Sequence, residues 1–320
     1  MRDVPTNERR AAVVGGSGFL GAPLSRALGS LYDEVVVLDI EPPEPEVAAV
    51  CRYVRCDVRD PEQVTRHLRG FETVYLLAGL LAKRSDEEPA TAWATNIGGT
   101  VTCLNALAGD PALRRVVFFS SSMIFDSAST VFPIHEDAPK RGERLYDQSK
   151  LIGEDLLTTF CRSYGVEGLA FRFFSAYGPG RFERRKGHFI ATWIDMVRNG
   201  EPLLVHGTGE QTIDLIHVDD VVQACVLGET LEVPRGAVEA FNVGSGVDTR
   251  VIDIASWILE VQPDAELRHG PGPKAAIRRR WADITRARRV LGYAPSVRPE
   301  DGVKGLARER LHPEVAADAS

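Results

Sequence analysis

Cysteine is scarce in this sequence, and its few copies follow no pattern. Five of the 320 residues are cysteine, and no two of them show the CxxC spacing of zinc sites and redox disulfides. An odd number without regular spacing also argues against a disulfide framework. We therefore expect no metal site and no structural disulfide, and a reducing cytoplasmic compartment fits this composition.

Long apolar runs and an excess of positive charge are also missing. No stretch is long and apolar enough to indicate a membrane span or the core of a signal peptide. The formal net charge is −7, which argues against nucleic acid or an anionic membrane as the main partner. The polar ends, 1–10 and 312–320, are expected to be flexible.

What the sequence does contain is an alternation of short apolar strands with helical patterns. Strands are predicted at 11–14, 34–39, 52–55, 73–79, 115–119 and 165–174. Helical patterns such as 61–68 and 89–107 lie between them. This alternation predicts an α/β fold in which a parallel sheet is covered by helices on both faces. Ligands of such sheets bind at the carboxyl ends of the strands.

Three glycines, Gly15, Gly18 and Gly21, follow the first predicted strand and open a helical pattern. Glycines here allow a tight turn, a close approach of the backbone to a pyrophosphate, and close packing of the helix on the strand. The N-terminus of that helix would then face the phosphates. Taken alone, the cluster is also typical of a strand-to-helix turn that binds nothing.

An acidic residue supports the reading of this turn as a dinucleotide site. Asp39 ends the second predicted strand and lies 18 residues after Gly21, close to the spacing of a carboxylate that binds the adenosine ribose. A carboxylate there repels the 2′-phosphate of NADP, and Ile40 and Glu41 follow instead of a basic residue. We therefore expect NAD as the cofactor.

Tyr146 and Lys150 are four residues apart in a predicted helix, so their side chains share one face. A nearby ammonium favours the phenolate and is expected to lower the tyrosine pKa by roughly 2–3 units, which makes the phenol usable for proton transfer. A serine from the run 120–122, at the end of the fifth strand, would hold the substrate oxygen. Such a Tyr/Lys pair also arises by chance, and the rest of the chain decides between these readings.

As an ordered set, these residues resemble a known family. Gly15-x-x-Gly18-x-x-Gly21, Asp39, Asn96, the serine run and Tyr146-x-x-x-Lys150 are similar to the extended short-chain dehydrogenases/reductases. More narrowly, they resemble the NAD-dependent sugar epimerase/dehydratase branch of the UDP-glucose 4-epimerase type, over about residues 11–310.

The resemblance implies a Rossmann-type doubly wound parallel sheet with a smaller C-terminal α/β substrate lobe. The NAD-binding domain is expected at 11–175, with interleaved segments from about 203–245. The substrate lobe is expected to occupy most of 176–310.

The resemblance also implies roles for individual residues. Tyr146 would be the catalytic acid/base, Lys150 its partner and Ser121 the substrate-binding hydroxyl. Ser122 is the alternative, because Asp126 replaces the glycine of the family pattern after the aromatic Phe125. The implied NAD contacts are Gly15, Gly18, Phe19, Leu20, Gly21, Asp39, Ile40, Asp57, Val58, Leu77, Ala78, Gly79, Asn96, Tyr146, Lys150 and Phe174. The implied substrate contacts are Ser121, Ser122, Tyr146, Ser175 and Arg181.

The type of reaction is narrowed by two positions. Dehydratases of this family carry Asp-Glu after the threonine, and the related decarboxylases carry a glutamate at the second place, but Ser122 and Met123 stand here. This pattern favours an epimerase, which oxidises an alcohol to a keto intermediate and returns the hydride. A dehydrogenase or ketoreductase with exchangeable cofactor is the alternative, and a dinucleotide-sensing regulator without turnover is the more distant one.

The contacts expected for a nucleotide diphosphate are changed at three positions. Ser175 stands where the family usually has asparagine, and Ile213 and Pro273 stand where or near where it has arginine. We therefore expect a carbohydrate whose carrier is held differently or is not an ordinary nucleotide diphosphate. Four basic residues would supply replacements or are solvated surface: Arg181, Lys274, Arg278 and Arg280.

An apolar stripe runs along the helix that follows Tyr146, within 151–160. Such a stripe is explained by the core alone. In the family that the sequence resembles, it often joins a preceding long helix in a dimer interface, and so we expect a homodimer.

Overall fold

The computed structural model describes residues 8–128, 131–180, 189–272 and 279–314. The chain divides into two compact units. The first, here called the sheet unit, comprises residues 1–129, 138–172 and 224–241, and the second comprises 130–137, 173–223 and 242–320. The predicted domain boundaries stay a prediction.

A seven-stranded sheet forms the centre of the sheet unit, within the described residues. Its strands are β1 (Arg10–Val14), β2 (Glu34–Asp39), β3 (Arg52–Arg55), β4 (Thr73–Leu76), β5 (Arg115–Ser121), β6 (Glu167–Phe173) and β11 (Val238–Val243). They are ordered β11-β6-β5-β4-β1-β2-β3. The pairs β1–β2, β1–β4, β2–β3 and β4–β5 are parallel. The order reverses at β1, as in doubly wound folds, and the predicted fold class is confirmed.

Helices connect these strands, and local signals explain where several of them begin and end. They are α1 (Gly21–Leu28), α2 (Pro45–Ala48), α3 (Pro61–His67), α4 (Ala82–Glu87), α5 (Pro89–Ala92), a π-helix (Trp93–Gly98), α6 (Gly99–Leu107), a 3₁₀ turn (Ser122–Ile124) and α7 (Leu145–Tyr164). The α3 helix begins with a proline, and the Asp60 carboxylate accepts hydrogen bonds from the Glu62 and Gln63 amides. The α7 helix ends at Gly165, whose φ of 65° suits a left-handed cap.

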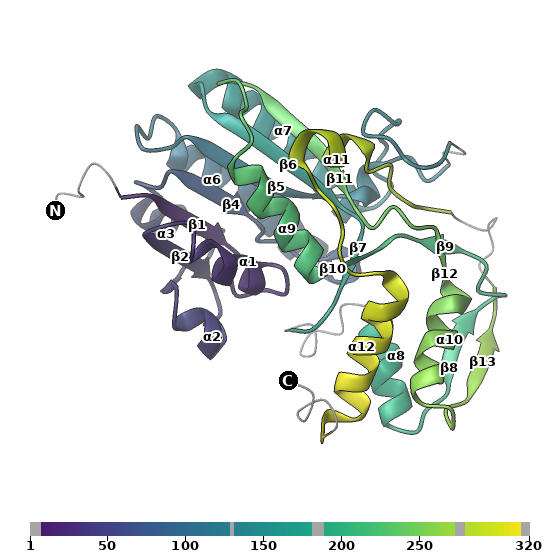
Figure 1. Ribbon diagram of the computed structural model, residues 1–320. Coiled ribbons are helices and arrows are strands. Elements are labelled where there is room, and N and C mark those ends of the chain that lie inside the picture. The colour runs from purple at the N-terminus through teal and green to yellow at the C-terminus, as the bar shows by residue number, and fades with distance from the viewer. Residues whose placement is uncertain (1–7, 129–130, 181–188, 273–278, 315–320) are drawn as a thin grey trace. The chain divides into compact units, whose positions relative to one another are not determined.

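One face of the sheet packs against α3, α6 and α7. Side chains alternate along each strand, so every second residue of a strand points toward these helices. In Figure 1, α6 lies on one face of the sheet and α1 on the other. Burying each large aliphatic side chain stabilises the fold by about 1.5–3 kcal/mol. Members of this core are Val36, Val74, Val116, Val64, Leu104 and Leu157.

The second unit has its own core and short strand pairs. Its strands are β7 (Ser175–Tyr177), β8 (Leu203–His206), β9 (Thr212–Ile213), β10 (Leu215–His217), β12 (Thr249–Arg250) and β13 (Leu267–Gly270). Its helices are α8 (Phe189–Arg198), α10 (Val251–Val261), α11 (Thr285–Leu291) and α12 (Pro299–Leu311), while α9 (Val218–Glu229) contributes to both units. Figure 1 shows α8, α10 and α12 gathered beside β8 and β13. Buried members of this core are Ile194, Leu203, Ile254 and Val303.

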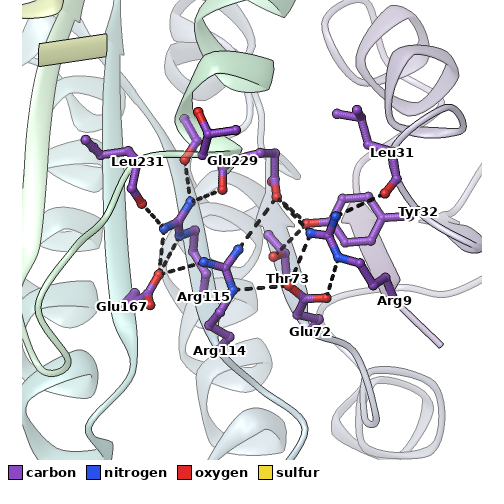
Figure 2. Close-up of polar contacts among 12 residues, drawn as sticks. Arg9, Leu31, Tyr32, Glu72, Thr73, Arg114, Arg115, Glu167, Glu229 and Leu231 are labelled. Atoms are coloured by element: carbon purple, nitrogen blue, oxygen red, sulfur yellow. Dashed lines mark hydrogen bonds and ion pairs between the residues drawn. The ribbon is translucent and has the colours of Figure 1, made fainter. Parts of the chain in front are cut away.

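The amino ends of the central strands are closed by charged and phenolic side chains, here called the amino-edge network (Figure 2). It consists of Arg9, Tyr32, Glu72, Tyr75, Arg114, Arg115, Glu167 and Glu229. The Arg115 side chain is fully buried at the start of β5, and its Nε donates to Glu167 at the start of β6 at 2.9 Å. The Glu229 carboxylate accepts from the phenols of Tyr32 and Tyr75. This edge is therefore filled by side chains, and the candidate site lies at the opposite edge.

None of the helices in the described part of the chain combines the length and the apolar character needed to cross a membrane.

Candidate active site

The glycine turn after β1 lies at the carboxyl edge of the sheet and is closely packed. Gly15 has a φ of +86°, which glycine adopts without strain, and its amide donates to the Leu38 carbonyl at 2.8 Å. A Cβ added at Gly15 would lie 2.7 Å from the Ala78 amide nitrogen. A Cβ at Gly21 would overlap the Gly15 carbonyl oxygen. Both positions therefore require glycine, as the turn of a dinucleotide site does.

Asp39 is tied directly to this turn. One carboxylate oxygen accepts a hydrogen bond from the Ser17 amide and the other from the Glu41 amide, each at 3.0 Å. A carboxylate has further lone pairs, so these two bonds leave it able to accept a ribose hydroxyl. The glycine turn, the start of α1 and this acid together fit the adenosine diphosphate half of NAD.

Other predicted cofactor residues follow β3 and β4. The Asp57 carboxylate is held by Arg59 through bonds of 2.6–3.1 Å, and this partner lowers the pKa of Asp57. Val58 is buried against Gly99 at the start of α6. Leu77 and Ala78 both donate backbone hydrogen bonds to the Val14 carbonyl. These contacts place the residues after β3 and β4 at the same edge as the glycine turn.

Asn96 lies in the π-helix, and its buried side chain is used by protein groups. Its amide oxygen accepts from the Leu80 amide at 2.7 Å. Its amide nitrogen donates to the Leu80 carbonyl at 3.0 Å and to the Ser149 hydroxyl at 3.1 Å. Ser149 in turn donates to the Tyr146 carbonyl at 2.7 Å. Asn96 therefore joins the loop after β4 to the helix that carries Tyr146, and its predicted contact with NAD stays a prediction.

Tyr146, Ser121 and Lys150 are brought together at the carboxyl end of β5. Tyr146 lies in the first turn of α7, and Asp147 secures the start of that helix by accepting from the Arg144 amide at 3.1 Å. The Ser121 hydroxyl lies beside the Tyr146 phenol and favours its ionised form. Lys150 is buried, and its Nζ lies 5.8 Å from the centre of the Tyr146 ring. The helical spacing predicted for this pair is confirmed.

The predicted lowering of the Tyr146 pKa is wrong for the protein chain by itself. Burial raises the pKa of Tyr146 to about 12, and the Ser121 hydroxyl offsets only part of this rise. The Lys150 ammonium donates to the Phe119 carbonyl at 2.7 Å instead of to the phenol. Burial also lowers the pKa of Lys150 to about 8. Desolvation therefore sets the direction of the Tyr146 shift, opposite to the lowering predicted from the spacing of Tyr146 and Lys150.

A comparison with models of protein families matches residues 11–244 to the NAD dependent epimerase/dehydratase family. The matched segment covers more than half of the chain. The chain belongs to this family. The predicted family, the NAD cofactor and the assignment to epimerase-type enzymes are thereby confirmed.

Relatives resemble this member of the NAD dependent epimerase/dehydratase family along most of its length. The UDP-glucose 4-epimerase of Mycolicibacterium smegmatis is 30% identical over 308 residues, which cover 92% of this chain and 96% of that protein. The UDP-glucose 4-epimerase of Thermotoga maritima, solved with UDP-glucose, has a TM-score of 0.86 at 26% identity and covers 96% and 99% of the two chains. MoeE5, solved with UDP-glucuronic acid and NAD, has a TM-score of 0.83 at 26% identity and covers 97% and 100%.

Several predicted contacts of this family member belong to the second unit. The buried Phe174 donates from its amide to the Val243 carbonyl, and the Ser175 amide donates to the Asp214 carbonyl. Ile213 pairs with Thr249 between β9 and β12. These predictions are not tested by the structure. Arg181, Pro273, Lys274 and Arg278 lie outside the described residues, while the Arg280 amide donates to Thr212 at 3.4 Å.

Sequence reasoning missed the residues that support the reacting groups. Ser149, which links Asn96 to Tyr146, gives no signal beyond its place one residue before Lys150. Glu154 is buried one turn beyond Lys150. The i, i+4 spacing from Tyr146 through Lys150 to Glu154 is visible in the sequence and is the signal that would have found it.

Proposed function

We propose that this enzyme is an epimerase that inverts a secondary alcohol carbon of a nucleotide-linked sugar, with carbon 4 of a UDP-hexose as the first candidate. The observation that carries the proposal is the grouping of Ser121, Tyr146 and Lys150 at the carboxyl end of β5, with Lys150 Nζ 5.8 Å from the centre of the Tyr146 ring. The turn that follows, Ser122–Ile124, contains no carboxylic acid. Elimination of water needs such a second acid, whereas oxidation and re-reduction of an alcohol does not.

In the proposed mechanism, Tyr146 handles the proton and Ser121 orients the oxygen. The phenolate of Tyr146 removes the hydroxyl proton as the C–H hydrogen leaves with its electron pair, which produces a ketone. Bound NAD would supply the acceptor for that hydride and its source for the return step. Return to the opposite face of the ketone, with the proton restored from Tyr146, gives the epimer. The overall reaction consumes neither oxidant nor reductant.

Lys150 and Ser121 would stabilise the phenolate form of Tyr146, which this proton transfer requires. A phenol with a pKa of about 12 is almost fully protonated at neutral pH, so little phenolate is present to act as a base. The Ser121 hydroxyl favours the phenolate, and the positive charge of an oxidised nicotinamide nearby would favour it further. Lys150, fixed on the Phe119 carbonyl, would bind the adjacent ribose and contribute its own charge.

Detection of turnover tests the proposal directly. Purified enzyme, incubated with UDP-galactose and without added cofactor, is followed by NMR of the anomeric protons. Formation of UDP-glucose supports the proposal, and retention of NAD through dialysis supports an epimerase rather than a dehydrogenase. Turnover that requires continuous supply of NAD or NADH, with a ketone accumulating or consumed, would establish the dehydrogenase or ketoreductase instead.

The identity of the nucleotide has its own test. The relatives named for UDP-sugars support UDP, whereas Ser175 and Ile213 predict a carrier that is held differently. A thermal-shift series with UDP, GDP, TDP, CDP and ADP separates these expectations. Strong stabilisation by UDP alone supports the UDP-sugar assignment, and a flat series supports an unusual carrier.

The proposed enzyme is a homodimer that uses α7. Leu157 and Phe160 are buried in the core of the sheet unit, but Leu151 and Ile152 on the same helix keep part of their surface exposed. Partly exposed aliphatic side chains on a long helix support an interface. Sedimentation of the wild type and of the variant Ile152→Glu tests this. The wild type should sediment as a dimer and the variant as a monomer, and a wild type with the mass of a monomer contradicts the proposal.

A cytoplasmic location completes the proposal. All five cysteines are buried free thiols. Burial raises the pKa of Cys51 and Cys56 to about 11, which makes these thiols unreactive. Free thiols in every position are typical of proteins from reducing compartments. Fractionation of cells followed by immunoblotting checks the location.

A further inference from the structure

A buried ion pair lies beneath the candidate active site. Arg172, near the end of β6, donates from Nε and Nη2 to the two carboxylate oxygens of Glu154 on α7, at 2.9 and 2.8 Å. The side chains of Arg172 and Glu154 are 4% and 10% exposed. The guanidinium also lies 5.5 Å from the centre of the Phe125 ring. A two-pronged contact of this kind fixes direction as well as distance.

Ser120 extends this ion pair to β5. Its hydroxyl donates to Glu154 Oε1 at 2.6 Å, and all three side chains are buried. We call Ser120, Glu154 and Arg172 the support cluster. It joins three elements, β5, α7 and β6, within the sheet unit.

The support cluster continues a row of contacts made by the reacting residues. Tyr146, Lys150 and Glu154 are spaced four apart on α7 and share one face. Tyr146 lies beside the side chain of Ser121, which lowers the pKa of its phenol. Lys150 donates to the backbone carbonyl of Phe119. Glu154 accepts from the hydroxyl of Ser120, which lies between Phe119 and Ser121 in the strand. Three helix residues therefore contact three consecutive residues at the end of β5.

The close approach of α7 to β5 makes this row possible. Gly153 lies over the ring of Phe118, and an added Cβ at Gly153 would overlap that ring. The helix backbone thus rests directly on the Phe118 side chain of β5. A small displacement here would change the contacts of Lys150 and Tyr146 directly.

We propose that Glu154, held by Arg172 and Ser120, is a positioning residue that sets where Lys150 and Tyr146 stand against the end of β5. The inference rests on the proposed function, because it assigns Tyr146 and Lys150 to the reaction. The charge of Glu154 is neutralised by Arg172, and a second cation, Lys140 Nζ, lies 3.9 Å from its carboxylate. Glu154 therefore acts by holding its neighbours in place and not by its charge. An error of about 1 Å in such groups costs about 100-fold in rate.

Two variants test the role, and a third is the matched control. S120A removes the bond between Glu154 and β5 while leaving the ion pair intact. E154Q removes the charge that Arg172 needs. E167Q is the control, because the partly buried Glu167 forms an ion pair with the buried Arg115 between the same two strands at their opposite ends (Figure 2). All three are expected to lose stability, but the control lies at the amino ends of β5 and β6.

The measurements are kcat, KM and the pH profile of kcat for interconversion of UDP-galactose and UDP-glucose, together with thermal melting. We expect S120A and E154Q to lose about 10- to 100-fold in kcat with little change in KM, and to shift the pH midpoint of kcat. E167Q should keep wild-type kcat and the wild-type pH profile at a lowered melting temperature. Equal kcat and equal pH profiles in S120A and E167Q would overturn the inference, even where E154Q does not fold.

Crystal structures of S120A and E167Q test the positioning role independently of the proposed function. Absence of UDP-sugar turnover in the wild type contradicts the proposed function by itself. The positioning role is then decided by geometry: the contact of 2.7 Å between Lys150 Nζ and the Phe119 carbonyl should be lost in S120A and kept in E167Q. Its persistence in S120A would overturn the role of the support cluster.

Discussion

The side-chain nitrogen of Lys150 donates a hydrogen bond of 2.7 Å to the backbone carbonyl of Phe119. This bond holds a buried ammonium at the end of β5, and the Tyr146 ring centre lies 5.8 Å away. Burial disfavours the charged amine and lowers its pKa to about 8. The lysine is thus held in place at a cost to stability.

Replacement of Lys150 by methionine should therefore stabilise the protein at neutral pH. Below pH 8 the buried amine of the wild type is charged, and the cost of burying it is fully present. Between pH 8 and its ordinary value of 10.5, the folded state binds fewer protons than the unfolded state, so wild-type stability rises with pH. K150M should gain up to about 3 kcal/mol of unfolding free energy at pH 7. The gain should fade above pH 8, and urea titrations at pH 7 and 10 check this; a gain that does not shrink would contradict it.

Replacement of Tyr146 by phenylalanine should abolish most turnover while NAD stays bound. Loss of the proton-transfer group costs about 10²–10⁴-fold in rate. Tyr164, at the far end of the same helix and half exposed, provides the matched control. Y164F should keep wild-type turnover and NAD content. Unchanged turnover in Y146F would remove the phenol from the mechanism.

The preference for NAD over NADP should depend on the charge of Asp39. D39N keeps a group that accepts from the Ser17 amide but removes the charge that repels a 2′-phosphate. We expect the ratio of the two dissociation constants to move toward NADP by about tenfold, equivalent to about 1.4 kcal/mol. Calorimetry on the cofactor-stripped protein measures both constants. E41Q, which removes a charge two residues later, is the control, and an equal shift in E41Q would show that Asp39 has no special role.

Two helical glycines should respond to alanine in opposite directions. Gly153 lies against the Phe118 ring, so G153A should cost about 1–3 kcal/mol through overpacking. Gly305 in α12 has open space where its Cβ would be, so G305A should gain up to about 1 kcal/mol from helix propensity. Chemical denaturation measures both. The double variant F118L/G153A should recover part of the loss, and strict additivity would argue against a direct clash.

Sequence patterns were enough to predict the sheet, the glycine turn and the Tyr146–Lys150 pair. These features depend on residues that are close in the chain: strand and helix periodicity, a glycine that must take a positive φ, and a spacing of four on one helix. The acid after the second strand was also found, because its distance from the glycine turn is a property of the βαβ unit.

The amino-acid sequence by itself determined the fold class, the family and the pair of groups that share a helix face. Only the tertiary structure decided how those groups titrate, since burial raises the Tyr146 pKa while Lys150 is held by the Phe119 carbonyl. The support cluster was likewise decided in three dimensions, because Ser120, Glu154 and Arg172 come from separate elements. Desolvation and long-range ion pairs depend on the surroundings of a residue in space, and local spacing along the chain does not contain that information.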